Sequence, residues 1–161
     1  MTSNITNEYN KFTSNVKNNK LTISGIEWNY YTLGQGSESF LILTGGGSIP
    51  EASFQYANAL SEKYKVIIPA LPQVYTMADC VEGVNQILIQ ENIANTNFLG
   101  FSMGGMISQC FVRKYPDKVK KRARNYVQRP PISQILYGKI YWFYCGLLPG
   151  NAWGRLPWRG Q

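Results

Sequence analysis

Three short apolar runs, separated by longer segments with helical periodicity, constrain the fold of this chain more than any other feature. The runs are uninterrupted and do not alternate between apolar and polar residues, which is typical of strands buried on both faces of a parallel sheet. The apolar runs are 40–43, 66–68 and 98–101, and the helical patterns are 53–63, 77–92 and 104–114. This order predicts an α/β fold with a mostly parallel sheet and helices on both of its faces.

Composition and charge predict one folded domain with a different segment at each end. The chain has 161 residues, of which 44% are hydrophobic, and this is enough for one core. Residues 1–117 hold all 9 acidic residues of the chain, whereas the remaining residues are basic and aromatic and contain no acid. We therefore expect a polar N-terminal extension at 1–19, a partial domain at 20–119 that opens with a pair of strands, and a basic aromatic tail at 120–161 that is non-native or disordered.

A serine flanked by glycines follows the third apolar run. Gly100-x-Ser102-x-Gly104 leaves a predicted strand and enters a predicted helix, which is the context of a nucleophile elbow. Small residues on both sides permit a sharp turn that exposes the serine hydroxyl at the helix N-terminus, where negative charge is stabilised. The alternative is a glycine-rich turn with a capping serine, but the surrounding strand and helix patterns favour the catalytic interpretation.

A second glycine run, from Gly45 to Gly47, follows the first apolar run at the same edge of the predicted sheet. An oxyanion hole needs two main-chain N–H groups that converge on one point. We predict that Met103 supplies one of them and that Gly46 or Gly47 supplies the other. Taken alone, such a run also fits a flexible loop or a phosphate-binding nest. A Walker-type phosphate loop is excluded because no Gly-Lys-Ser/Thr follows.

With these motifs in place, the chain resembles the N-terminal half of an α/β-hydrolase over roughly residues 20–119. Members of this family hydrolyse esters, thioesters, amides or similar bonds of small molecules through Ser, Asp or Glu, and His in that chain order. The resemblance implies that Ser102 is the nucleophile, and no cofactor or metal is expected. Thr44 stands where family members commonly have His before the glycine run. Because the oxyanion donors are main-chain groups, this change removes a side chain that orders the loop and leaves the donors in place.

The other two members of the catalytic triad have no counterpart in this sequence. No acid follows Asp117, and the chain contains no His, so Ser102 lacks the base that a serine hydroxyl needs. An aliphatic strand is expected after Val119, but the sequence continues Lys-Lys-Arg-Ala-Arg. We therefore expect a truncated or frameshifted, near-inactive hydrolase. The alternative is a non-catalytic interaction protein that uses the basic aromatic tail on an anionic membrane surface or a nucleic acid.

Cysteine usage and the polar N-terminus bear on location and partners. Cys80, Cys110 and Cys145 form no C-x-x-C motif, which favours a reducing compartment and predicts a cytoplasmic protein. No signal peptide, transmembrane segment or specific nucleic-acid partner is expected. If the strand that normally follows the elbow helix is absent, the elbow strand becomes an exposed edge. Such an edge is a predicted site for aggregation or for contact with chaperones.

Overall fold

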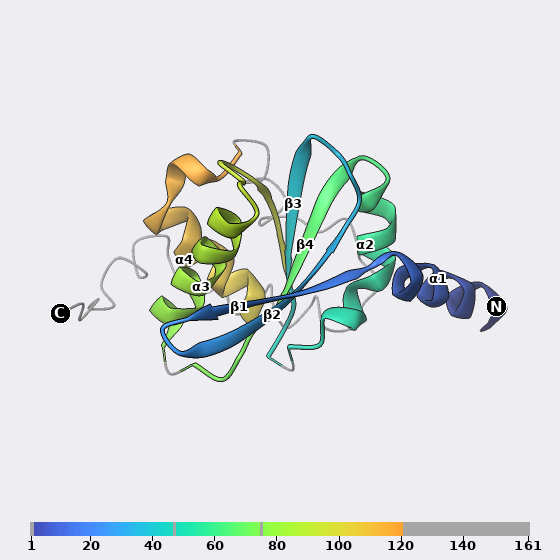
Figure 1. Ribbon diagram of the computed structural model, residues 1–161, viewed down its shortest axis with the longest axis horizontal. Helices are drawn as coiled ribbons and strands as arrows, with labels where there is room; N and C mark the ends of the chain where they lie inside the picture. The colour runs from blue at the N-terminus through green and yellow to red at the C-terminus, as the bar shows by residue number, and fades with distance from the viewer. Residues whose placement is uncertain (1, 47, 75, 121–161) are drawn as a thin grey trace, which may run out of the picture. The chain divides into compact units, whose positions relative to one another are not determined.

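The computed structural model describes residues 2–46, 48–74 and 76–120, all of which belong to a compact unit that spans Met1–Arg129. Its elements alternate between helix and strand after an initial helix and hairpin (Figure 1). In chain order they are α1 (Thr2–Asn15), β1 (Lys17–Ile23), β2 (Ile26–Leu33), β3 (Glu38–Leu43), η1 (Pro50–Ser53), α2 (Phe54–Ser61), β4 (Tyr64–Ala70), α3 (Met77–Gln90), β5 (Asn97–Gly100), α4 (Met103–Lys114) and η2 (Pro116–Lys118).

The five strands form one sheet in the order β1-β2-β4-β3-β5. Strands β4, β3 and β5 run parallel, whereas β2 is antiparallel to both β1 and β4, so the sheet is mixed. The three parallel strands are those predicted from the uninterrupted apolar runs, and the antiparallel pair β1–β2 opens the domain. The predicted α/β fold class is therefore confirmed.

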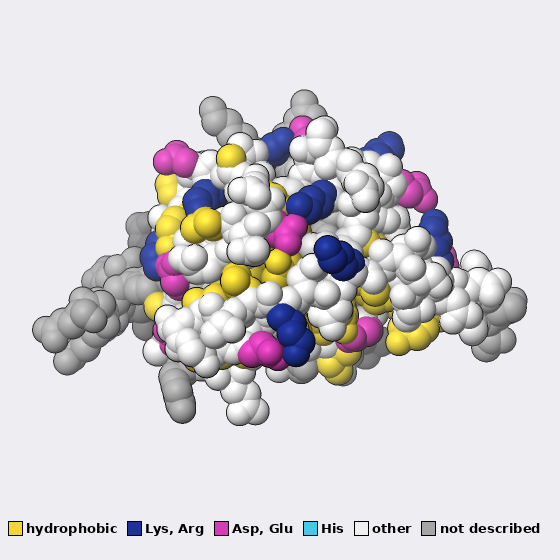
Figure 2. Space-filling model, in the orientation of Figure 1, with side chains coloured by type: hydrophobic (Ala, Val, Ile, Leu, Met, Phe, Trp, Pro, Cys, Tyr) yellow, Lys and Arg dark blue, Asp and Glu magenta, His cyan; other side chains and the backbone are white. Residues whose placement is uncertain are grey.

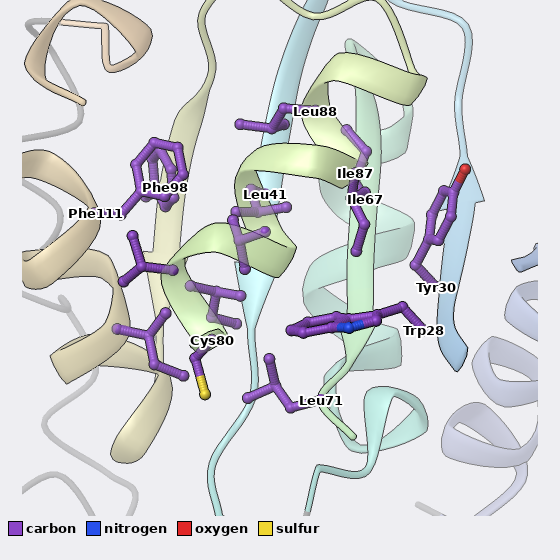
Figure 3. Packing of buried hydrophobic residues seen from close by; sticks show 14 of the residues in the cluster. Trp28, Tyr30, Leu41, Ile67, Leu71, Cys80, Ile87, Leu88, Phe98 and Phe111 are labelled. Carbon is purple, nitrogen blue, oxygen red and sulfur yellow. The ribbon is translucent and has the colours of Figure 1, made fainter. Parts of the chain in front are cut away.

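Helices cover both faces of the sheet, as Figure 1 shows. Helices α3 and α4 pack on one face over a cluster that contains Trp28, Leu41, Ile67 and Phe98 (Figure 3), and α1 and α2 pack on the other face. A Cβ atom at Gly83 of α3 would lie 2.0 Å from the Trp28 ring. Only glycine therefore lets α3 approach the sheet this closely at that point.

Helix α1 lies within the segment that the sequence assigns to a polar extension. The Phe12 side chain is 1% exposed and belongs to the core beneath α2. The Tyr9 ring contacts the Phe54 ring edge to face at a centroid distance of 5.6 Å. Asn58 Nδ2 donates a 2.8 Å hydrogen bond to the Glu8 carbonyl oxygen. These contacts join α1 to α2, although the polar composition of the segment gave no signal for a helix.

The last described residues lie beside the residue that precedes β5. The Thr96 N–H donates to the Lys118 carbonyl oxygen at 2.9 Å, and the Lys120 N–H donates to the Thr96 carbonyl oxygen at 3.1 Å. These two bonds form a parallel bridge between Thr96 and Val119. The predicted tail at 120–161 lies outside the described residues except for Lys120. Within the part of the chain that is described, no helix is long and apolar enough to cross a bilayer.

Candidate active site

Ser102 lies at the junction of β5 and α4, in a backbone conformation that is rare for a residue with a side chain. Its dihedral angles are φ 51° and ψ −123°, so it is one of few non-glycine residues of the described chain with a positive φ. Such a conformation costs free energy and persists only where the surrounding structure enforces it. The side chain is exposed and makes no capping hydrogen bond to α4. The alternative role as a capping serine therefore does not apply.

The two flanking glycines permit this turn by keeping main-chain segments close together. A Cβ atom at Gly100 would lie 2.7 Å from the Gly104 carbonyl oxygen and 2.7 Å from Ser108 Oγ. A Cβ atom at Gly104 would lie 2.2 Å from the Leu43 carbonyl oxygen. Real Cβ atoms essentially never approach other atoms this closely, so both positions require glycine. The pattern of small residues predicted from the sequence thus has a direct steric cause in the packing of α4 against β3 and β5.

The glycine run after β3 lies next to Ser102. The Phe101 N–H donates a 2.9 Å hydrogen bond to the Leu43 carbonyl oxygen, which ties the two loops together. A Cβ atom at Gly45 would lie 3.3 Å from Ser102 Cβ and 3.9 Å from its Oγ. Gly46 is exposed and has open space around its Cα. Gly47, the other predicted oxyanion donor, lies outside the described residues.

Gly45 is the residue of this loop that sequence reasoning missed. It is part of the glycine run, but the choice among the three glycines depends on the path of the loop in space. The available signal was general: glycine is preferred wherever a backbone approaches another group closely. In the structure, Gly45 makes that approach, and a larger side chain there would crowd the Ser102 side chain.

Main-chain hydrogen bonds close the turn at the start of α4. The Gly104 N–H donates to the Phe101 carbonyl oxygen and the Gly105 N–H donates to the Ser102 carbonyl oxygen, both at 2.9 Å. Met103, the predicted oxyanion donor, is the first residue of α4 and directly follows Ser102. The helix dipole of α4 adds partial positive charge at the end of the helix where the Met103 N–H lies.

The loop that carries Gly45 and Gly46 is held at both ends. Ser48 N–H donates a 2.9 Å hydrogen bond to the Gly45 carbonyl oxygen, which closes a tight turn. Ser48 Oγ accepts a hydrogen bond from the Leu71 N–H, just beyond β4. Thr44 is 4% exposed, and its Oγ1 has no hydrogen-bond partner among the described residues. Buried hydroxyls are normally paired, so Thr44 contributes packing to the loop without an ordering hydrogen bond.

An aromatic pair joins the elbow to α2. The Phe101 and Tyr56 rings are 5.2 Å apart between centroids, and burial raises the pKa of the Tyr56 hydroxyl above its ordinary value. Tyr56 is therefore a neutral hydroxyl at physiological pH and cannot act as a base. Among the described residues, no group of three His, Cys, Asp or Glu side chains could hold a metal ion.

A Ser-His-acid triad cannot form around Ser102 from this chain alone. The chain contains no His. Asp117 is the last acid, and it lies in η2, beyond the far end of α4. With a rise of 1.5 Å per residue, the twelve-residue helix separates Asp117 from Ser102 by roughly 18 Å. Asp117 is therefore too distant to orient a base beside the serine.

Comparison with known proteins places this geometry in a family. A family model for the alpha/beta hydrolase fold matches residues 38–123, more than half of the chain. No curated protein matches the chain.

Solved structures share the fold at low sequence identity. They include the epoxide hydrolase VrEH1 from Vigna radiata (TM-score 0.62, 18% identity, 66% of this chain and 38% of that chain). A bacterial membrane phospholipase A gives a TM-score of 0.62 with 21% identity, covering 73% of this chain and 41% of that chain. A haloalkane dehalogenase variant from Bradyrhizobium elkanii gives a TM-score of 0.60 with 15% identity, covering 65% of this chain and 38% of that chain. The chain thus spans about two fifths of the length of these structures. The match of the family model over residues 38–123, together with this shared fold, shows that the chain belongs to the α/β-hydrolase family.

Proposed function

We propose that Ser102 is the nucleophile of a hydrolase site for ester, thioester or amide bonds of small molecules. The observation that carries the proposal is the positive φ of Ser102 at a strand-to-helix turn, with its side chain exposed and not used as a helix cap. The three structural relatives named above catalyse different reactions according to their names, so the fold does not define the bond that is cleaved. The choice of an acyl substrate rests on the serine and on the donors around it.

The residues of the site have separate roles in this reaction. Ser102 Oγ attacks the substrate carbonyl carbon, and the carbonyl oxygen becomes an oxyanion that accepts hydrogen bonds from the N–H groups of Met103 and Gly46. The leaving group departs with a proton, and water then releases the acid and restores the hydroxyl. Main-chain donors aimed at the developing charge are a large source of rate enhancement in such sites. Gly47 remains a candidate for the second donor.

We further propose that the 161-residue chain is nearly inactive because it supplies no base. A serine hydroxyl is un-ionised at neutral pH and reacts slowly unless a neighbouring group removes its proton. In the serine protease subtilisin, loss of the catalytic His lowers kcat by about a million-fold. The change from an acid-containing chain to the run Lys120-Lys-Arg-Ala-Arg124 supports a truncated or frameshifted form. Translation of the DNA after the codon for Val119 in the other two reading frames tests this proposal. If neither frame encodes an aliphatic strand and a later His, the proposal is wrong.

Labelling with a fluorophosphonate tests separately whether Ser102 is the nucleophile and whether the chain lacks a base. In this reaction the serine oxygen forms a bond to phosphorus, fluoride leaves and the serine proton is taken up by a base. We expect slow labelling at Ser102, read by peptide mass spectrometry, that increases when imidazole is added as an external base. Ser102→Ala should abolish it. Ser24→Ala is a matched control, because Ser24 is also exposed and has a φ of 50° in a turn outside the site.

Each outcome of this experiment decides one point. Labelling spread equally over Ser102 and Ser24 would show that Ser102 is not an activated nucleophile. Rapid labelling of Ser102 without imidazole would show that the chain already has a base, and the inactive interpretation would be wrong.

A further inference from the structure

The outer edge of β1 presents a row of main-chain groups that point away from the sheet. β1 is an end strand, and the two-residue turn of Ser24 (φ 50°) and Gly25 (φ 79°) pairs Ile23 with Ile26. In an antiparallel hairpin with this turn, alternate residues bond the partner strand. The N–H and C=O groups of Asn18, Lys20 and Thr22 are therefore directed outward. Among the described residues, these groups have no main-chain partner.

A groove lies beside this edge, between β1 and α3. It has a volume of about 420 Å³, and its apolar part is formed by Leu21, Ile23 and Ile89. Ile89 is 51% exposed, although it is a large apolar side chain. Gln86 and Gln90 add amide groups to the lining of the groove, and Glu82 adds a carboxylate that accepts hydrogen bonds from Lys114 and Tyr115. Figure 1 places β1 across α3 in this view, and Figure 2 shows hydrophobic side chains at the surface of the same face.

The side chains of β1 give this edge a positive charge. β1 carries Lys17 and Lys20 and no acidic residue. Lys20 Nζ contacts Glu27 Oε1 at 3.0 Å, but both side chains are more than half exposed. An exposed ion pair of this kind is weak and exchanges readily with other partners. Lys20 and the outward groups of Thr22 can therefore interact with a carboxylate on an approaching strand.

We propose that this edge and its groove, here called the β1 groove, bind an extended peptide segment in which apolar and acidic residues alternate. The segment adds a strand parallel to β1 through the outward groups of Asn18, Lys20 and Thr22, because in a parallel ladder its hydrogen-bonding residues lie opposite Leu21 and Ile23 rather than opposite Lys20. Because side chains of a strand alternate between its two faces, its apolar residues enter the groove against Leu21 and Ile89. Its acidic residues then lie on the opposite face, beside Lys20. Strand addition of this kind is a recurring mode of peptide recognition.

The lysines of β1 disfavour a second copy of this chain as the occupant of the edge. If the β1 strands of two copies paired antiparallel about their central residue, one Lys20 would lie directly opposite the other. Like charges in that position are destabilising. Lysines on an edge strand also protect against unwanted pairing. That protective role accounts for Lys17 and Lys20, but it does not account for an exposed Ile89 in a groove next to the edge.

A peptide titration of the full ¹⁵N-labelled chain tests the proposal. The probe is acetyl-Val-Glu-Val-Glu-Val-amide with N-methyl groups on its two glutamates, so that only one edge can pair and the probe does not self-associate. We expect saturable shifts of the amide signals of Asn18, Lys20 and Thr22. The variant Ile89→Gln should bind about fivefold more weakly, because a half-exposed apolar side chain loses its contact. Ile49→Gln is the matched control, since Ile49 is 57% exposed outside the groove.

The remaining outcomes contradict the proposal in different ways. The same probe with lysines in place of glutamates should bind more weakly, and equal binding would overturn the acidic preference. No shift at the three amides would leave β1 as a protected edge and nothing more. Equal binding by Ile89→Gln and the unmodified chain would remove the groove from the site.

Discussion

The main-chain N–H of Phe101 donates a 2.9 Å hydrogen bond to the carbonyl oxygen of Leu43. This bond joins the residue before Ser102 to the residue before Thr44, so that the elbow and the glycine loop begin side by side. Parallel strands β3 and β5 are neighbours in the sheet, and both loops therefore leave it at the same edge. The local sequence supplies the small residues, and the strand order brings them together.

Substitution of Gly104 tests how closely α4 packs against β3. Gly104→Ala places a Cβ atom 2.2 Å from the Leu43 carbonyl oxygen, and a main-chain atom cannot easily move away. We expect a loss of about 2 kcal/mol in the free energy of unfolding, measured by urea denaturation. Gly46→Ala is the control, because open space surrounds Gly46, and it should change stability by no more than about 0.5 kcal/mol. Equal effects of the two variants would contradict the close packing.

The conformation of Ser102 predicts that glycine is tolerated better than alanine at this position. Its positive φ of 51° is costly for any residue with a Cβ atom, at about 1–3 kcal/mol. Ser102→Ala and Ser102→Gly both remove the hydroxyl, but only glycine also removes the Cβ. Glycine adds backbone entropy to the unfolded chain, which offsets part of the gain. We expect Ser102→Gly to be more stable than Ser102→Ala by about 1 kcal/mol in urea denaturation, and the reverse order would show that the turn is unstrained.

The sequence predicted the central fold well because the apolar runs leave few alternatives. The runs at 40–43, 66–68 and 98–101 fall within or at the end of β3, β4 and β5, and the intervening helical patterns correspond to α2 and α3. Buried parallel strands need apolar residues on both faces, so their signal is local and strong. The direction of β2, which runs antiparallel to β4, depends on contacts between distant segments.

Helix α1 and the role of Gly45 were beyond local reasoning for different physical reasons. In α1, the polar residues dominate, and its position depends on Phe12 and on contacts with α2. In the glycine run, three identical residues follow one another, and only the loop path shows that Gly45 approaches Ser102. Ser102 itself could be singled out because the elbow motif combines a short pattern with a strand before it and a helix after it.

The attachment of α1 leads to a prediction about the N-terminal segment. Phe12→Ala removes a side chain that is 1% exposed, and Phe-to-Ala changes in cores cost about 3–5 kcal/mol. Phe12 belongs to the smaller of the two clusters, beside Tyr31, and we expect a value near the lower end of this range in thermal or urea unfolding. Ile5→Ala is the control on the same helix, since Ile5 is 54% exposed, and it should have little effect. A small effect of both substitutions would mean that α1 does not contribute to the stability of the domain.

Glu82 links α3 to the end of α4 and gives the fold a defined response to acid. Hydrogen bonds from Tyr115, then from Gln86 and Lys114, lower the pKa of Glu82 from 4.5 to about 2, although burial opposes the shift. Since the folded pKa is the lower one, the stabilisation is complete above the unfolded pKa and disappears as the pH falls from about 4.5 to about 2. The side chain is 39% exposed, so solvent screening reduces the effect to about 1 kcal/mol.

The variant Glu82→Gln should therefore be less stable than the unmodified chain by about 1 kcal/mol at pH 7. The difference should shrink as the pH approaches 2, because Glu82 then becomes neutral in both states of the unmodified chain. Urea denaturation at several pH values measures both curves. Glu62→Gln is the matched control: Glu62 contacts Lys11 at 3.8 Å through highly exposed side chains, and such pairs contribute little. A difference between Glu82→Gln and the unmodified chain that stays constant from pH 7 to pH 2 would show that the carboxylate charge is not what joins the two helices.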